Sequence, residues 1–229
     1  MTPAPVECVE LQTRDQPDAS IVWLHGLGAD GYDFVPIVKE LEALNAPAAR
    51  FVFPHAPKIP VTINNGYVMR AWYDVVGTDL VRREDATGIR ASATIVERLI
   101  EREIERGIAR HRIVLAGFSQ GGAIALHVGL RQPQPLAGIM ALSTYLPLAD
   151  HFEHERSAAA QATPVFMAHG TGDPIVPHAR GLASRDRLVG LGYDVTWREY
   201  PMPHSVCGEE VEDIAAFLQR VLGAQAAGT

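Results

Sequence analysis

The chain has 229 residues, 47% of them hydrophobic and 21% charged, which is an ordinary composition for a globular protein with one sizeable core. A formal net charge of −7 and scattered positive residues argue against a nucleic-acid-binding protein, which usually carries a basic patch. The two cysteines, Cys8 and Cys207, have neither disulfide-framework nor metal-ligand spacing, and this favours a reducing compartment.

Targeting and membrane signals are not visible in the sequence. The N-terminal letters MTPAPVECVELQ lack the basic start and long apolar core of a secretory signal peptide. No apolar run approaches the roughly 20 residues that cross a bilayer. We therefore expect a cytoplasmic protein without a membrane span.

Continuous apolar runs predict buried strands along the chain. They read SIVWLHG (20–26), ARFVFPHAP (49–57), RIVLAGFS (112–119), LAGIMALST (136–144) and TPVFMAHGTGD (163–173). A sixth segment, DVTWREYP, has the pattern of a late strand. Because the runs are continuous rather than alternating, we expect strands that are covered on both faces, as in a parallel sheet.

Helical patterns lie between these strands. One face collects Ile89, Ala93, Val96, Ile100 and Ile104, with Gly107 as the stop. A second helix is predicted from Pro177 to about Leu191, before Gly192, and a last one carries the stripe Val211, Ile214, Ala215, Leu218 and Leu222. Strands that alternate with helices predict one doubly wound α/β domain over residues 1–229, with a frayed tail at 223–229.

The segment from Lys58 to Gly88 breaks this alternation. Its roughly thirty residues show no clear helix or strand pattern, and loops longer than about 15 residues are uncommon and often functional. It contains Tyr67, Trp72 and Tyr73, whereas disordered segments are usually poor in aromatic residues. We predict a long ordered loop that packs over the sheet edge.

A single serine stands between glycines in AGFSQGG, where an apolar run meets a helical pattern. The window Gly117–Gly121 matches the G-x-S-x-G nucleophile elbow, in which a tight strand-to-helix turn exposes the serine hydroxyl. Glycine is needed on either side because other side chains would collide with the neighbouring strand and helix. The five-residue pattern also occurs in ordinary glycine-rich turns. We predict that Ser119 is a nucleophile because the pattern lies at the end of an apolar run and at the start of a predicted helix.

A serine hydroxyl needs a base, and in this arrangement an acid and then a histidine follow it along the chain. Asp173 follows an apolar strand, and His204 lies between the late strand and the last helix, so both lie where strand ends meet. The rival histidines are His25, His127, His169 and His178; for His169 we favour a structural hydrogen bond. The rival acids Asp150, Asp186, Asp194 and Asp213 lack the strand-end position.

Acyl transfer also needs hydrogen-bond donors for the developing oxyanion. We predict the backbone N–H of Gln120, directly after the nucleophile, and that of Leu27 in the glycine-rich stretch LHGLGADG. No histidine, cysteine or acid cluster has convincing metal spacing and no phosphate-binding G-x-x-x-x-G-K-[ST] pattern occurs, so we predict neither a metal nor a cofactor.

Seven motifs, spread almost from end to end of the chain, resemble the carboxylesterase and acyl-protein thioesterase group of α/β-hydrolases. In chain order they are WLHGLGADGYDF, FPHAP, RAWYD, GFSQGGAIAL, LAGIMALSTYLPL, HGTGDPIVP and YPMPHSVC. The resemblance implies an α/β-hydrolase fold, with a mostly parallel central sheet flanked by helices and no large cap domain. It also implies a Ser119–Asp173–His204 triad and oxyanion donors at Leu27 and Gln120. Homodimers are common in the group, so the resemblance also implies a homodimer as one expectation for this protein.

The long loop with Trp72 would then form one wall of the acyl site. Trp72, Leu27 and Val176 are the candidate residues of the acyl pocket, with ordinary packing as the alternative for each. The expected reaction is hydrolysis of an acyl ester or thioester through an acyl-enzyme. The alternatives are a lysophospholipase, an acyl-protein thioesterase, a peptidase and a non-catalytic binding protein that has this fold.

Overall fold

The seven-stranded sheet of this protein brings the predicted site residues to one edge. The computed structural model describes residues 6–77 and 84–223. The strand order is β1-β3-β2-β6-β7-β8-β9, with β1 antiparallel to β3 and the other pairings parallel. The strands are β1 (Cys8–Gln12), β2 (Ser20–Leu24), β3 (Arg50–Pro54), β6 (Ile113–Phe118), β7 (Gly138–Leu142), β8 (Val165–Gly170) and β9 (Val195–Tyr200).

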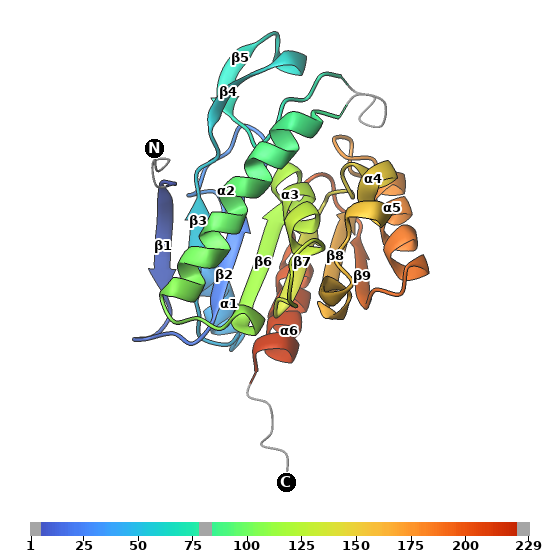
Figure 1. The fold of residues 1–229 in the computed structure, drawn as a ribbon. Coiled ribbons are helices and arrows are strands. Elements are labelled where there is room, and N and C mark those ends of the chain that lie inside the picture. Colours follow the sequence, from blue (N-terminus) through green and yellow to red (C-terminus); the bar gives the residue numbers. More distant parts are fainter. Residues whose placement is uncertain (1–5, 78–83, 224–229) are drawn as a thin grey trace.

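Helices cover both faces of the sheet (Figure 1). Buried side chains of α2, α3 and α5 join one core cluster, with Phe152 of α4, and those of α1 and α6 join the cluster on the opposite face. The helices are α1 (Ile37–Ala43), α2 (Ala86–Glu105), α3 (Gln120–Gly129), α4 (Ala149–Glu155), α5 (His178–Gly190) and α6 (Gly208–Leu222). Three short 3₁₀ turns complete the elements, at Thr62–Asn64, Arg110–Arg112 and Ala159–Ala162.

The predicted α/β fold with a mostly parallel central sheet is confirmed. Strands β2, β3, β6, β7 and β8 are almost wholly buried, as continuous apolar runs require. Alternate residues serve opposite faces: Val22 and Leu24 belong to one core cluster, and Ile21 and Trp23 belong to the other. The predicted helix ends are confirmed too, since Gly107 and Gly192 follow α2 and α5 with φ of +93° and +83°.

The prediction of one long loop over 58–88 is wrong for most of its described part. The segment holds a β-hairpin of β4 (Lys58–Val61) and β5 (Tyr67–Arg70), and α2 already begins at Ala86. Strands of four residues are too short for an alternating pattern to emerge, and Pro60 argues against a strand by its type. Residues 78–83 of the predicted loop, and 224–229 of the predicted tail, lie outside the described residues.

Hydrogen bonds hold the base of the hairpin to the carboxyl ends of the first strands. The Gly28 N–H donates to the Arg70 carbonyl oxygen at 2.9 Å, and the Arg70 guanidinium donates to the Ala56 carbonyl oxygen at 2.9 Å. The hairpin therefore stands above the end of the sheet where the site residues gather (Figure 1). Among the helices described, none is both long and apolar enough to cross a membrane.

A buried carboxyl group lies at the start of the last helix. Glu210 is 0% exposed, and neither of its carboxyl oxygens has a hydrogen-bond partner within the described chain. Burial raises the pKa of Glu210 from an ordinary value of 4.5 to about 8; the nearby Cys207 backbone N–H opposes this shift, and the charge of Asp213 adds to it. The group is therefore neutral in the folded protein at neutral pH.

We expect Glu210→Gln to remove a pH dependence of stability. The pKa of Glu210 is higher in the folded than in the unfolded protein, so folding favours the protonated carboxyl group. The contribution of Glu210 to the free energy of unfolding is therefore fully present below about pH 4.5 and is lost as the pH rises through about 8. The loss reaches about 1.4 kcal/mol per pH unit in that window. Urea unfolding at several pH values should show the variant gaining on wild type as pH rises. The exposed neighbour variant Glu209→Gln should follow wild type, and parallel curves for Glu210→Gln would contradict the prediction.

Candidate active site

The turn between β6 and α3 holds Ser119 in a strained conformation. Its φ of 55° and ψ of −120° lie in a region that side chains rarely adopt. The Ser119 N–H donates to the Leu142 carbonyl oxygen at 2.8 Å, and the Thr144 hydroxyl donates to the Ser119 carbonyl oxygen at 2.6 Å. Both partners come from the end of β7 or the residues after it, so the neighbouring strand fixes the serine backbone.

Close backbone contacts explain the glycines around this serine. A Cβ atom on Gly117 would overlap the backbone of Gly121, and one on Gly121 would overlap the carbonyl oxygen of Leu24. A Cβ atom on Gly122 would lie 2.7 Å from the methyl carbon of Thr144. The helix can therefore start directly above β2 and β7 only because these side chains are missing.

Asp173 and His204 meet although they are far apart in the sequence. Nδ1 of His204 lies 2.6 Å from Oδ2 of Asp173, a distance typical of a hydrogen bond to a charged group. Asp173 stands on the loop after β8, and His204 on the loop between β9 and α6. The Asp173 side chain is fully buried, whereas the His204 side chain keeps 15% exposure.

Its own loop and the end of β8 hold the Asp173 carboxylate in place. Its Oδ1 atom accepts the backbone N–H groups of Ile175 and Val176 at 2.8 and 2.9 Å. Nε2 of His169 lies 3.4 Å from Oδ2 of the same carboxylate and 2.9 Å from the Val176 carbonyl oxygen. Since a carbonyl oxygen only accepts, that nitrogen carries a proton; this is the structural hydrogen bond expected of His169. Burial lowers the pKa of His169, which favours the neutral ring.

The imidazole of His204 lies beside the serine turn. Its ring centroid is 4.7 Å from that of Phe118, the residue immediately before Ser119. Ser119 is 8% exposed and lines a cavity of about 420 Å³. The structure thus gathers the three predicted residues at one edge of the sheet, with the histidine and the acid in direct contact.

The two predicted oxyanion donors flank the serine. Gln120 is the first residue of α3, and the first N–H groups of a helix have no partner within it. The loop after β2 approaches from the other side, since a Cβ atom on Gly26 would lie 3.5 Å from the Cβ of Ser119. Within the part of the chain that is described, neither the Leu27 nor the Gln120 N–H is paired.

The prediction that Trp72 lines the acyl site is wrong. Trp72 is 2% exposed and packs beneath the site, where its indole N–H donates to the His25 carbonyl oxygen at 2.9 Å. The next residue, Tyr73, lines the cavity instead, together with the predicted Leu27 and Val176. The order of two adjacent aromatic residues in a sequence does not tell which ring faces the cavity, because the packing of the segment decides it.

The side chain of Gln120 makes two hydrogen bonds that the sequence analysis did not predict. Its carbonyl oxygen accepts the Trp72 N–H at 2.8 Å, and its amide donates to the Tyr73 carbonyl oxygen at 2.7 Å. These two bonds tie the segment after β5 to the serine turn. The only hint in the sequence was a glutamine directly after the nucleophile. Its structural role could not be predicted, because its partners lie almost fifty residues earlier in the chain.

Most of the rival residues have other partners or are buried. Nε2 of His25 accepts the Ala56 N–H at 3.0 Å, and burial lowers the pKa of His127 to about 4. The Asp213 carboxylate accepts the Tyr200 hydroxyl at 2.8 Å, and the acids Asp186 and Asp194 pair with Arg185 and Arg220. Across residues 6–77 and 84–223, no three His, Cys, Asp or Glu side chains form a group that could hold a metal ion.

The glycines at 26, 28 and 31 also have the spacing of the dinucleotide-binding pattern G-x-G-x-x-G. That pattern works because a helix N-terminus opens within it and faces the pyrophosphate. Here α1 begins only at Ile37, and the Gly28 N–H is already bonded to the Arg70 carbonyl oxygen. The loop therefore lacks the geometry of a dinucleotide site.

We expect Gly121→Ala to prevent correct assembly of the serine turn. The added methyl group would overlap the Leu24 carbonyl oxygen, and a backbone atom in the sheet cannot move aside cheaply. Thermal unfolding should show a loss of stability of several kcal/mol or no folded protein. The matched control is Gly190→Ala at the end of α5, where nothing lies within 4 Å, and it should be neutral or slightly stabilising. Equal stability of the two variants would contradict the prediction.

Known proteins are similar to this chain in sequence and in fold. The family model described as Phospholipase/Carboxylesterase matches residues 7–222. Acyl-protein thioesterase 1 of Gibberella zeae is 42% identical over 216 residues, covering 90% of this chain and 92% of that protein. Acyl-protein thioesterase 1 of Cryptococcus neoformans is 36% identical over 237 residues, covering 96% and 99%. The crystal structure of Arabidopsis thaliana SOBER1 superposes with a TM-score of 0.83 at 32% identity, covering 89% of this chain and 99% of that one.

The match spans nearly all of the described residues, and the relatives are covered almost to their full length. Identity of this size over such a length is accompanied by the same fold in the solved structure. The chain therefore belongs to the phospholipase/carboxylesterase family of α/β-hydrolases, a family of enzymes that cleave ester bonds.

Proposed function

We propose that this protein hydrolyses carboxylic esters through an acyl-enzyme, with Ser119 as the nucleophile, His204 as the general base and Asp173 as its orienting acid. The observation that carries the proposal is the 2.6 Å contact between His204 and Asp173 beside a strained, nearly buried serine. An acid, a histidine and a serine linked in this way form the machinery of serine hydrolases on several unrelated folds, although their order along the chain differs between folds.

The reaction begins with attack of Ser119 Oγ on the acyl carbonyl carbon, while Nε2 of His204 takes the hydroxyl proton. Asp173 keeps the proton on Nδ1, so Nε2 is free to accept the serine proton, and the charge of Asp173 stabilises the imidazolium that forms. The Leu27 and Gln120 N–H groups stabilise the negative oxygen of the tetrahedral intermediate. The imidazolium then gives its proton to the leaving oxygen or sulfur, and water repeats the sequence on the acyl-enzyme.

The lining of the cavity supports an acyl substrate. Most of its residues are aliphatic or proline, and they include Leu27, Val176 and the exposed Ile63 and Ile175 at its mouth. An apolar pocket with a few polar groups suits a hydrocarbon chain that ends in a reactive carbonyl. The fungal relatives named acyl-protein thioesterases favour a thioester as a second substrate class. A lysophospholipid would place the same acyl group in the same cavity.

The setting of the reaction is also part of the proposal. Both cysteines are free thiols, which supports the cytoplasm as the location. We also propose that the protein forms a homodimer. Sedimentation of the purified protein, which measures its molecular mass in solution, tests this directly.

Removal of the proposed nucleophile or base should abolish ester hydrolysis. We expect Ser119→Ala and His204→Ala to lower kcat by at least about 10⁴-fold on p-nitrophenyl esters, because triad members act as one unit. His111→Ala, at an exposed position in a short 3₁₀ turn, is the matched histidine control and should leave kcat unchanged. Near wild-type turnover in Ser119→Ala or His204→Ala would show the assignment to be wrong.

A covalent intermediate should be detectable on Ser119. Acid quenching during turnover of a p-nitrophenyl ester, followed by mass spectrometry, should find a peptide containing Ser119 with the mass of the acyl group added. Slow esters and a long-chain thioester extend the same measurement to the two substrate classes. The Ser119→Ala protein provides the blank, and acylation of another residue in wild type would contradict the mechanism.

A further inference from the structure

Two tyrosine hydroxyls form a buried pair in the wall of the cavity that holds Ser119. The oxygens of Tyr73 and Tyr145 are 3.0 Å apart, which makes one hydrogen bond. The residues are 3% and 4% exposed, and both line the cavity. The exposed aliphatic residues Ile63 and Ile175 mark the mouth, so the hydroxyl pair belongs to the interior.

The hydrogen-bond count of this pair leaves one proton over. Each phenol has one O–H, and a mutual bond uses only one of the two protons. No hydrogen bond from either hydroxyl to a third acceptor is found within the described chain. The Arg180 guanidinium lies 3.8 Å from the centre of the Tyr145 ring, but guanidinium groups carry donors and no acceptor. A buried donor without a partner costs about 1–3 kcal/mol, so a ligand acceptor that meets it is strongly favoured.

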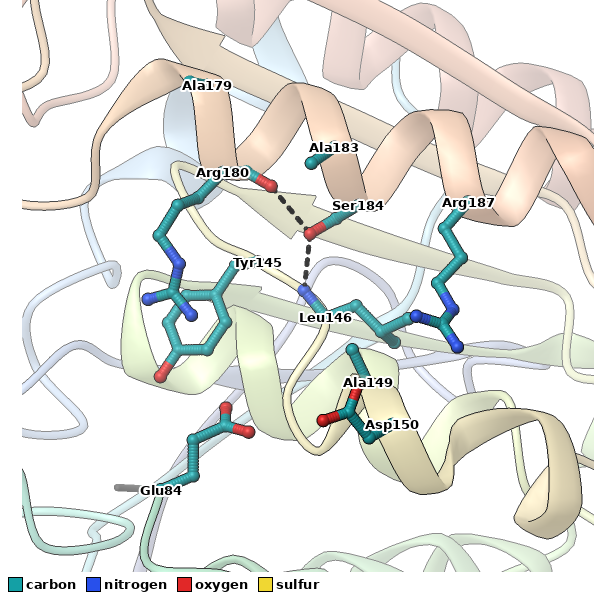
Figure 2. Close-up of a pocket in the computed structure, with 10 residues that line it drawn as sticks. All are labelled: Glu84, Tyr145, Leu146, Ala149, Asp150, Ala179, Arg180, Ala183, Ser184 and Arg187. Carbon is teal, nitrogen blue, oxygen red and sulfur yellow. Dashed lines mark hydrogen bonds between the residues drawn. The ribbon is translucent and has the colours of Figure 1, made fainter. Parts of the chain in front are cut away.

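The nearest acid does not accept this proton. Glu84 lies across a second cavity that shares Tyr145, and Figure 2 shows its carboxyl group below the phenol. Its Oε2 atom accepts the Leu148 N–H at 2.9 Å, while its Oε1 atom is buried without a hydrogen-bond partner among the described residues. No hydrogen bond joins either oxygen to Tyr73 or Tyr145 in the described chain. A water between Glu84 and Tyr145 is the competing explanation, and it predicts no effect on substrate choice.

Both tyrosines are held firmly, as a recognition element requires. The Tyr73 carbonyl oxygen accepts the Gln120 amide, and the Ser92 hydroxyl bonds the carbonyl of the preceding residue. On the other side, Ser184 accepts the Leu146 N–H at 2.9 Å and donates to the Arg180 carbonyl oxygen at 2.8 Å (Figure 2). The hydroxyl pair is therefore set between the serine turn and α5.

The remaining polar side chains of the cavity are committed or lie at its mouth. The Gln120 amide is bonded to the backbone on both sides. Asn64 is exposed and its amide lies 3.3 Å from the Met69 sulfur. Apart from Ser119, the hydroxyl pair is thus the buried polar feature of an otherwise apolar wall.

We infer that the acyl site selects acyl groups that carry an oxygen along the chain, such as hydroxy-, oxo- or ether-acyl groups, with the Tyr73–Tyr145 pair as the donor to that oxygen. The inference rests on the proposed function and names its substrate class. A plain hydrocarbon chain fits the aliphatic walls, but it offers no acceptor for the proton that has none among residues 6–77 and 84–223. A site built around a donor discriminates against a ligand that lacks the acceptor.

The test compares p-nitrophenyl octanoate with analogues in which an ether oxygen replaces one methylene in turn along the outer half of the chain. For each analogue we measure the ratio of its kcat/KM to that of octanoate, in wild type and in Tyr73→Phe/Tyr145→Phe. At one oxygen position the wild-type ratio should exceed that of the double variant by about 3- to 10-fold, the value of one hydrogen bond. Comparing ratios removes differences in the intrinsic reactivity of the esters.

Matched controls keep the result interpretable. Tyr193→Phe removes another buried hydroxyl, one that has no partner among the described residues and does not line the cavity, and it should keep the wild-type ratios. If the double variant does not fold, the single variants replace it, and the one that removes the donor should lose the preference. Equal ratios in wild type and variants at every position, with octanoate still hydrolysed, would overturn the inference alone. Absence of Ser119-dependent hydrolysis of any ester would instead overturn the proposed function.

Discussion

The contact of the α3 start with the end of β2 is the constraint on which the rest of the site depends. Gly121 lies so close to the Leu24 carbonyl that no side chain fits between them. This closeness forces the sharp turn at Ser119 and its unusual backbone angles. It also brings the loop after β2 against the serine, which is how Leu27 becomes available as a backbone donor. The strain is stored where the nucleophile must be exposed, and the surrounding parallel strands supply the stability that maintains it.

Remote segments reach this turn through hydrogen bonds rather than through apolar packing alone. Hydrogen bonds of the Gln120 side chain connect the segment after β5 to the start of α3. The Asp173 carboxylate accepts backbone N–H groups of its own loop through one oxygen and contacts His204 through the other. Each of these carboxyl or amide groups is largely buried and has its polar atoms paired. Networks of this kind are rigid, because every member that moves would leave another without a partner. That rigidity fits an enzyme that must hold its proton-transfer groups ready before substrate arrives.

The buried ionisable groups divide into those with partners and those without. Asp173 has backbone and imidazole partners, whereas the Glu210 carboxyl oxygens have no hydrogen-bond partner at normal distance among the described residues and burial raises the pKa of the group. The tyrosine pair in the cavity is an intermediate case, since one of its two protons is hydrogen-bonded and the other has no acceptor within the described part of the chain. The physical difference is that an unpaired donor beside a cavity can be met by a ligand, while a carboxyl group buried beneath a helix can only lose its charge.

The sequence by itself determined the fold class, the strand runs, the helix stops at Gly107 and Gly192, and the predicted Ser119, Asp173 and His204, because burial periodicity and chain order are local properties. Strand ends of a parallel sheet meet at one edge, so three distant residues could be placed together before any coordinates. The hairpin of β4 and β5, the exchange of Trp72 for Tyr73 in the cavity wall and the partners of Gln120 were decided only by the tertiary structure. Four-residue strands leave no readable pattern, and the choice between two adjacent aromatic rings depends on which side of the chain the core lies, which no local pattern contains.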